Sequence, residues 1–129
     1  MALHNIVQTT TIWGITNQVI PSNAGPGGDF LTVGPELADR IKKVNTCFVT
    51  NMSATTDYEA TVYHYIADNN GSGVPNTLHF ASSVVVPAKS TIVVISNANP
   101  VYLNEGDYLG GFSNVVSRLT FTLSYEVIF

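Results

Sequence analysis

Three histidines, one cysteine and nine acidic residues are the side chains in this chain whose types can support acid–base, nucleophilic or metal chemistry. His4, His64 and His79 are not three or four residues from one another or from Cys47, which is the spacing that metal fingers use. No serine lies in the G-x-S-x-G turn that exposes a nucleophile at the end of a strand. The sequence therefore predicts no enzyme activity, no metal site and no cofactor.

The acidic residues are dispersed, and only Glu105 and Asp107 form a close pair around a glycine. A calcium site needs six or more oxygen ligands, and Asn104-Glu-Gly-Asp107 lacks such a ligand series. A glycoside hydrolase needs two acids across a cleft, which dispersed acids do not suggest. We expect the pair to lie in a solvated turn.

His64 and Cys47 both lie in strand-like runs, and each has a structural interpretation. Alternation along the run predicts that His64 points inward with Val62 and Ile66, as a neutral imidazole bonded to a backbone carbonyl. Cys47 has no partner for an internal disulfide and is of a residue type that is commonly buried. Both side chains are therefore expected in the core, with Cys47 unreactive.

Aromatic side chains are the remaining candidates for a binding site. Trp13, beside Ile12 and Ile15, indicates core or a subunit interface, since a tryptophan buries a large area, and a stacking platform for a sugar is the alternative. Tyr63 and Tyr65 are predicted on the outer face of their strand, where an interface or a stacking platform for a sugar are the alternatives. The candidate interface residues are Trp13, Ile15, Phe30, Tyr63, Tyr65 and Tyr102.

Charged residues make up 11% of the chain, against about 25% in typical soluble domains. Thr, Asn and Ser replace them, so the predicted surface is polar but weakly ionic, which favours a subunit of a permanent assembly. A secreted Thr/Asn-rich protein is the alternative. With a net charge of −4 and five scattered cations, there is no basic stripe to bind nucleic acid.

No segment has the character of a targeting or membrane-spanning sequence. The first residues lack a basic region followed by an apolar one, and no run contains about eighteen uninterrupted apolar residues. We therefore expect neither a signal peptide nor a membrane partner.

The elements that position these candidate side chains are predicted to be short strands. Large apolar residues alternate with polar ones over 119–127 and again over 58–66. The run at 44–51 is predicted to form a β-hairpin with 58–66, and the runs at 79–86 and 90–96 to form a second one. Shorter pieces are expected at 9–13, 30–33, 101–103 and 107–112, with one helical turn at 34–41.

These elements predict a single all-β domain over residues 1–129, an antiparallel β-sandwich of jelly-roll or immunoglobulin-like type with about eight short strands and little or no helix. A small barrel is the alternative. Residues 1–28, rich in loop formers, are a candidate extended N-terminal arm. The predicted core consists of Val44, Phe48, Val62, Ile66, Val85, Val94, Leu119, Phe121 and Leu123.

The segment from Val84 onward carries turns and strands at fixed spacing: Pro87-Ala88, Thr91 to Ile95, Asn99-Pro100, Tyr102-Leu103, Glu105-Gly-Asp107 and Ser124-Tyr-Glu126. This series resembles the C-terminal pattern of small tailed-bacteriophage virion proteins. Ile41-Lys-Lys-Val44 followed by Val49-Thr-Asn51 is similar to that family's second strand. The portion before Phe30 and the loop at 68–77 depart from the pattern.

The resemblance implies a non-enzymatic building block of the virion, assembled in the host cytoplasm. Such proteins include head decoration (cement) proteins, which oligomerise, often as trimers, and bind the major capsid protein lattice or other virion proteins. A neck or tail component is an alternative, and so is a glycan-binding receptor module of a phage fibre.

Overall fold

The computed structural model describes residues 12–21, 29–32, 41–67, 75–104 and 106–128. Within these ranges the chain forms nine strands and no helix, and so none that is long and apolar enough to cross a membrane. The strands are β1 (Ile12–Val19), β2 (Asp29–Thr32), β3 (Ile41–Asn51), β4 (Tyr58–Ile66), β5 (Asn76–Val86), β6 (Ser90–Ile95), β7 (Val101–Leu103), β8 (Tyr108–Ser113) and β9 (Leu119–Ile128).

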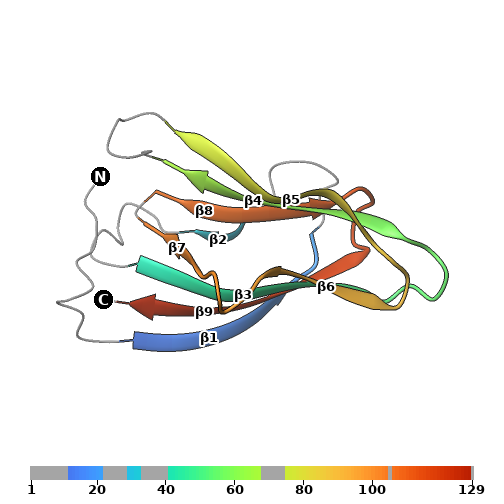
Figure 1. The fold of residues 1–129 in the computed structure, drawn as a ribbon, viewed down its shortest axis with the longest axis horizontal. Helices are drawn as coiled ribbons and strands as arrows, with labels where there is room; N and C mark the ends of the chain where they lie inside the picture. Colours follow the sequence, from blue (N-terminus) through green and yellow to red (C-terminus); the bar gives the residue numbers. More distant parts are fainter. Residues whose placement is uncertain (1–11, 22–28, 33–40, 68–74, 105, 129) are drawn as a thin grey trace.

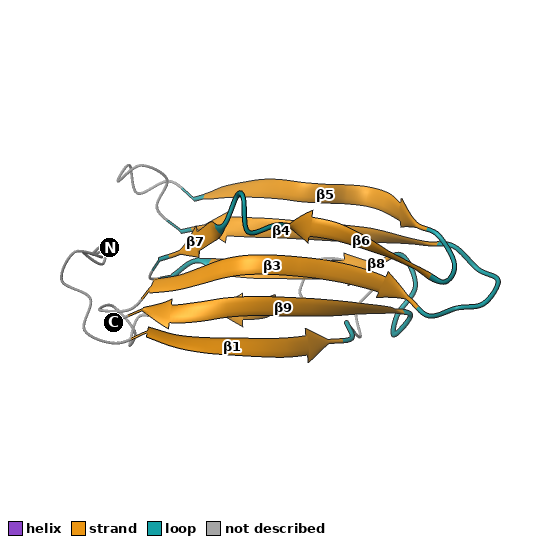
Figure 2. Cartoon of the chain, turned by 60° about the horizontal axis from the view of Figure 1, so that its bottom comes forward, coloured by secondary structure: helices purple, strands orange, loops and turns teal. Residues whose placement is uncertain are grey.

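The strands form two antiparallel sheets that pack face to face (Figure 1), which confirms the predicted β-sandwich. One sheet has the order β1-β9-β3-β6, and three of its strands, β1, β9 and β3, run side by side in Figure 2. The other sheet has the order β2-β8-β4-β5. β6 and β7 together form one edge of the first sheet. β6 pairs with residues 47–51 of β3, and β7 pairs with residues 42–44 of the same strand.

The pairing of the strands is nested. β4 pairs with β5, β3 with β6 and β7, β2 with β8, and β1 with β9, so the chain resembles one long hairpin that has been rolled up. Contacts of β3 with β9 and of β4 with β8 then join the pairs into the two sheets. With β6 and β7 counted as one position, this is the eight-strand arrangement of a jelly roll. The immunoglobulin-like and barrel alternatives do not fit it.

Both predicted hairpins are wrong. β3 and β4 belong to different sheets, as do β5 and β6, and neither pair is hydrogen-bonded as neighbours. The connections at 52–57 and 87–89 carry the chain from one sheet to the other, across a gap of about 10 Å between packed sheets. Turn-forming residues mark where a strand ends, but a turn within a sheet and a crossing between sheets use the same residue types.

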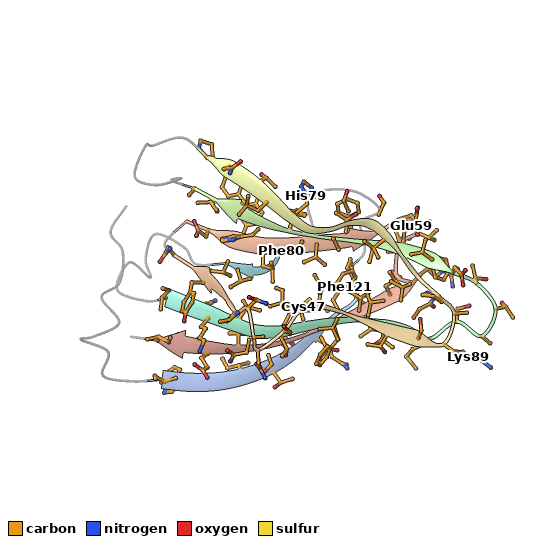
Figure 3. The ribbon with its side chains drawn as sticks, viewed as in Figure 1. Cys47, Glu59, His79, Phe80, Lys89 and Phe121 are labelled. Carbon is orange, nitrogen blue, oxygen red and sulfur yellow. The ribbon has the colours of Figure 1, made fainter. Side chains whose placement is uncertain are left out.

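The core lies between the sheets and is supplied by alternating residues of β9. Leu119, Phe121 and Leu123 are fully buried, as predicted, and Tyr125 and Val127 continue the same face. Figure 3 shows Phe121 between the two sheets. Val44, Val62 and Val94 of the predicted set also lie in or against this core.

Phe48, Val85 and Ile66 were predicted in the core and are not fully buried there. β3 contains one extra residue between Val44 and Thr46, which exchanges the two faces beyond it and leaves Phe48 pointing outward. Val85 is 51% exposed because Val86, its neighbour, takes the inward position. Ile66 is only half-buried at the end of β4.

Cys47 lies fully inside the core, as predicted, and burial raises the pKa of its thiol from 9.0 to about 12. Because the thiolate is the nucleophile, we expect a disulfide reagent to leave Cys47 unmodified in the folded protein at mildly alkaline pH and to label it fully in urea. The folded-state pKa lies above the unfolded value, so stability is expected to fall as the pH rises from about 9 towards 12. Rapid labelling of the folded protein would contradict this assignment.

Several predictions concern residues outside the described ranges or only partly within them. The helical turn at 34–41 lies outside, apart from Ile41, which begins β3. Of the candidate arm, residues 1–11 and 22–28 lie outside, whereas residues 12–19 form β1 and pair with β9 along its length.

Candidate functional site: the outer aromatic face

The outward side of the four-stranded sheet carries a cluster of aromatic rings. In β4, Ala60 and Val62 are fully buried in the core, so the intervening residues point away from it. The regular pairing of β4 with β8 then places Tyr63 opposite Gly110 and Tyr65 opposite Tyr108. We call Tyr63, Tyr65, His79, Tyr108 and Phe112 the outer aromatic face.

The rings of this face contact one another in a continuous group. Tyr65 and Tyr108 stack at 4.6 Å between ring centroids with only 11° between their planes. Tyr63 lies 6.0 Å from His79, 6.2 Å from Tyr108 in an edge-on arrangement, and 6.4 Å from Phe112. Tyr63 is only 6% exposed, although it points away from the sandwich core, because these neighbours surround it. The tyrosines were predicted on this face, and the structure confirms that.

Gly110 makes room for the central ring. A Cβ atom at this position would lie 2.6 Å from the Cζ and hydroxyl oxygen of Tyr63, closer than carbon and oxygen atoms approach without a clash. A glycine inside a strand marks either a bulge or a close approach of other atoms to the backbone. The pairing of β4 with β8 continues without a shift there, so the glycine allows a close approach of a side chain.

We expect Gly110→Ala to displace Tyr63 and to lower the free energy of unfolding by about 1–3 kcal/mol, since overpacking forces neighbours to move. Gly14→Ala is the matched control, because nothing lies within 4 Å of the added Cβ atom in β1. Urea unfolding measures the stability, and near-ultraviolet circular dichroism reports the tyrosine environment. Equal stability of the two variants would contradict the close approach.

The outer aromatic face includes no acid, lysine or arginine among its five residues. His79 is exposed, while Tyr65, Tyr108 and Phe112 are half-buried. Such a surface offers apolar ring faces and phenolic hydroxyl groups, which contact a protein or stack on a sugar. Within the described ranges, no three His, Cys, Asp or Glu side chains gather as they would around a metal ion.

The other predicted interface residues lie elsewhere. Trp13 (55% exposed) and Ile15 (37%) lie on β1, at the edge of the five-stranded sheet, so Trp13 is not a core residue. Tyr102, 40% exposed, lies on β7 beside β3, at the opposite edge of that sheet. Phe30 is in β2. The six candidates therefore do not form one surface, and only Tyr63 and Tyr65 lie on the outer aromatic face.

Asp107 was expected in a solvated turn and is instead 2% exposed. Its Oδ1 accepts a hydrogen bond from the Ala67 amide at 3.0 Å, and its Oδ2 accepts one from the Asn104 amide at 3.1 Å. His64, inward as predicted, has its Nε2 3.4 Å from the same Oδ2, so its partner is this carboxylate rather than the expected carbonyl. These contacts of the Asp107 carboxylate hold the end of β4 against the turn before β8, so the role of Asp107 is structural.

Comparison with known proteins finds no family model, no curated protein and no solved structure that matches this chain.

Proposed function

We propose that this chain is a non-enzymatic structural subunit of a tailed-phage particle, which decorates the head by binding the major capsid protein lattice. The observation that carries the proposal is the outer aromatic face, an uncharged cluster of rings on the surface of a weakly charged chain. The jelly-roll arrangement supports it by analogy, since viral capsid domains use this fold. A fold hosts many functions, so the analogy adds to the surface argument and does not replace it.

The outer aromatic face suits a protein partner for two reasons. Tyrosine and phenylalanine are enriched in interfaces, while lysine and glutamate are depleted there. In addition, Tyr65 and Tyr108 already hold each other in a stacked position, so little side-chain freedom remains to be lost when a partner binds. Many copies on a lattice would add avidity to a contact of modest affinity.

The test is retention of the protein on purified heads by sedimentation, together with its copy number per particle. Tyr65→Ala is expected to reduce retention about tenfold or more, as loss of an aromatic anchor does. Tyr102→Ala is the matched control, since that tyrosine is exposed on another edge, and it should leave retention unchanged. A handful of copies per particle, or equal loss in both variants, would overturn the head assignment and favour the neck or tail.

A second candidate is a glycan-binding module of a phage fibre. The nearly parallel Tyr65 and Tyr108 rings, with the exposed His79 on the neighbouring strand, favour it, because flat rings bind the apolar faces of sugars. Lectin domains also use the jelly roll. A glycan array probed with the isolated protein tests this candidate: signal that Tyr65→Ala removes would support it, and a blank array would eliminate it.

A further inference from the structure

β1 is an edge strand with an unusually regular structure. It lies at the end of its sheet and pairs with β9 over eight residues, from Ile12 opposite Ile128 to Val19 opposite Phe121, without a register shift. Its sequence, IWGITNQV, contains no charged residue and no proline. Edge strands normally carry charges, prolines or bulges, or are very short, because an unprotected edge pairs with other chains.

The other described edge strands have such protection. β5 is shifted twice against β4 and contains Ser83 at a φ of 50°, a left-handed conformation that interrupts an extended edge. β6 is six residues long and is shifted against β3, and β7 has only three residues. β2 has only four residues and is shifted against β8. Among the strands that the structure describes, β1 alone combines length, regularity and lack of charge at an edge.

β1 also exposes apolar side chains on both faces. Trp13 and Ile15 lie opposite Val127 and Tyr125, whose side chains face the core, so they extend the inner face of the sheet past β9. They are nevertheless 55% and 37% exposed. On the other face, Ile12 is 58% exposed. A further strand paired at this edge would place its own side chains beside these on both faces of the sheet.

We infer that β1 binds β1 of a second copy of this chain, antiparallel and about a twofold axis, so that the two five-stranded sheets become one. A twofold contact needs a single unprotected edge, because each copy supplies the same one. A head-to-tail contact would need two different unprotected edges, and β1 is the one that the described strands provide. The inferred unit is therefore a dimer rather than the trimer that the resemblance implies.

The charge and the side-chain pattern of β1 both suit pairing with itself. With no charged residue in either copy, no like charges face each other across the new ladder. A twofold axis perpendicular to the sheet keeps the inner faces on one side, so Trp13 and Ile15 of both copies lie on a common surface. Aromatic and β-branched side chains on one face of neighbouring strands stabilise antiparallel pairing. The inference does not depend on the particle to which the protein belongs.

Analytical ultracentrifugation over a range of concentrations tests the dimer. The wild type is expected to be dimeric at micromolar concentrations, and Ile15→Lys, which places two lysines on the paired strands, to weaken association at least about tenfold. Val93→Lys is the matched control, because Val93 is an exposed β-branched residue of the edge strand β6. Resistance of Cys47 to a thiol reagent shows that each variant is folded. A monomeric or trimeric wild type, or equal weakening by both substitutions, would overturn the inference.

A scan of single cysteines along β1 locates the axis. The eight residues of β1, from Ile12 to Val19, are replaced one at a time, and disulfide-linked dimers are measured after mild oxidation. Opposed Cα atoms of an antiparallel pair lie about 4.5–5.5 Å apart, within the range that a disulfide bridges. One or two adjacent positions should cross-link efficiently, and Thr91→Cys on β6 should not. No cross-linking in β1, or cross-linking at β6 instead, would overturn the pairing.

The experiments distinguish failure of the proposed head-binding function from failure of the inferred dimer. Loss of head binding in Tyr65→Ala with the dimer intact supports both proposals. Heads that do not retain the wild type contradict the proposed function, and the ultracentrifugation result still decides the dimer. Conversely, a monomeric wild type that binds heads contradicts the dimer alone.

Discussion

Asp107→Ala is expected to lower the free energy of unfolding by about 2–4 kcal/mol, since a buried hydrogen bond to a charged group contributes about 1.5–3 kcal/mol and its loss leaves donors unpaired. The carboxylate is 2% exposed and accepts hydrogen bonds from the Ala67 and Asn104 amides. Alanine leaves both amides without this acceptor and removes the partner of His64. The end of β4 and the turn before β8 should loosen together.

Urea unfolding of Asp107→Ala is compared with that of Asp57→Ala. Asp57 also accepts a backbone hydrogen bond, from the Ala88 amide at 2.9 Å, but in an exposed position where water can replace it. Its loss should cost about 0.5–1 kcal/mol. If the two variants are equally stable, the buried carboxylate does not have the role that its geometry indicates.

Asn51→Ala is expected to cost about 2–3 kcal/mol, because it leaves several buried polar groups unpaired. The Asn51 side chain is 1% exposed and donates through Nδ2 to the carbonyl oxygens of Thr56 and Val86, both at 2.9 Å. Its Oδ1 accepts a hydrogen bond from the Ser53 amide at 3.0 Å. Since Asn51 ends β3 and Val86 ends β5, one side chain connects the two sheets at this end of the sandwich.

The control for Asn51 is Asn114→Ala, which removes an exposed side chain that accepts a hydrogen bond from the Glu59 amide at 2.9 Å. We expect that change to cost about 1 kcal/mol or less. Asn51→Asp adds a sharper test, because a carboxylate would face the carbonyl oxygens of Thr56 and Val86 and should be at least as harmful as alanine. An aspartate variant as stable as the wild type would contradict the assigned amide orientation.

The sequence predicted the fold class because apolar and polar residues alternate along every strand that has no bulge. β9 has no extra residue of its own, so its inward face was correct from Leu119 to Val127. β3 has one extra residue, and β5 is shifted twice against β4, so alternation assigned Phe48 and Val85 to the wrong face. A bulge leaves little trace in composition, because its extra residue is of an ordinary type.

The candidate site was predictable only in part. Alternation placed Tyr63 and Tyr65 outward, but the partners of these tyrosines come from β5 and β8, and strand order decides which distant strands are neighbours. Asp107 was missed because Glu-Gly-Asp is a typical exposed turn sequence. The left-handed Gly106 and the bonds from Asn104 and Ala67 to the carboxylate appear only when the turn closes on the end of β4.

The nested pairing also determines when the protein can fold. Of the described strands, β9 is the farthest along the chain, and it lies between β1 and β3, so Ile12 finds its partner only when Ile128 has been added. β3 can pair with β6 and β7 earlier, but β1 cannot join the sheet until β9 has been synthesised. Folding is expected to be slow, in milliseconds to seconds, as for other sheets built from distant segments. During that interval the uncharged β1 remains exposed, so the yield of folded protein should depend on the temperature and rate of synthesis.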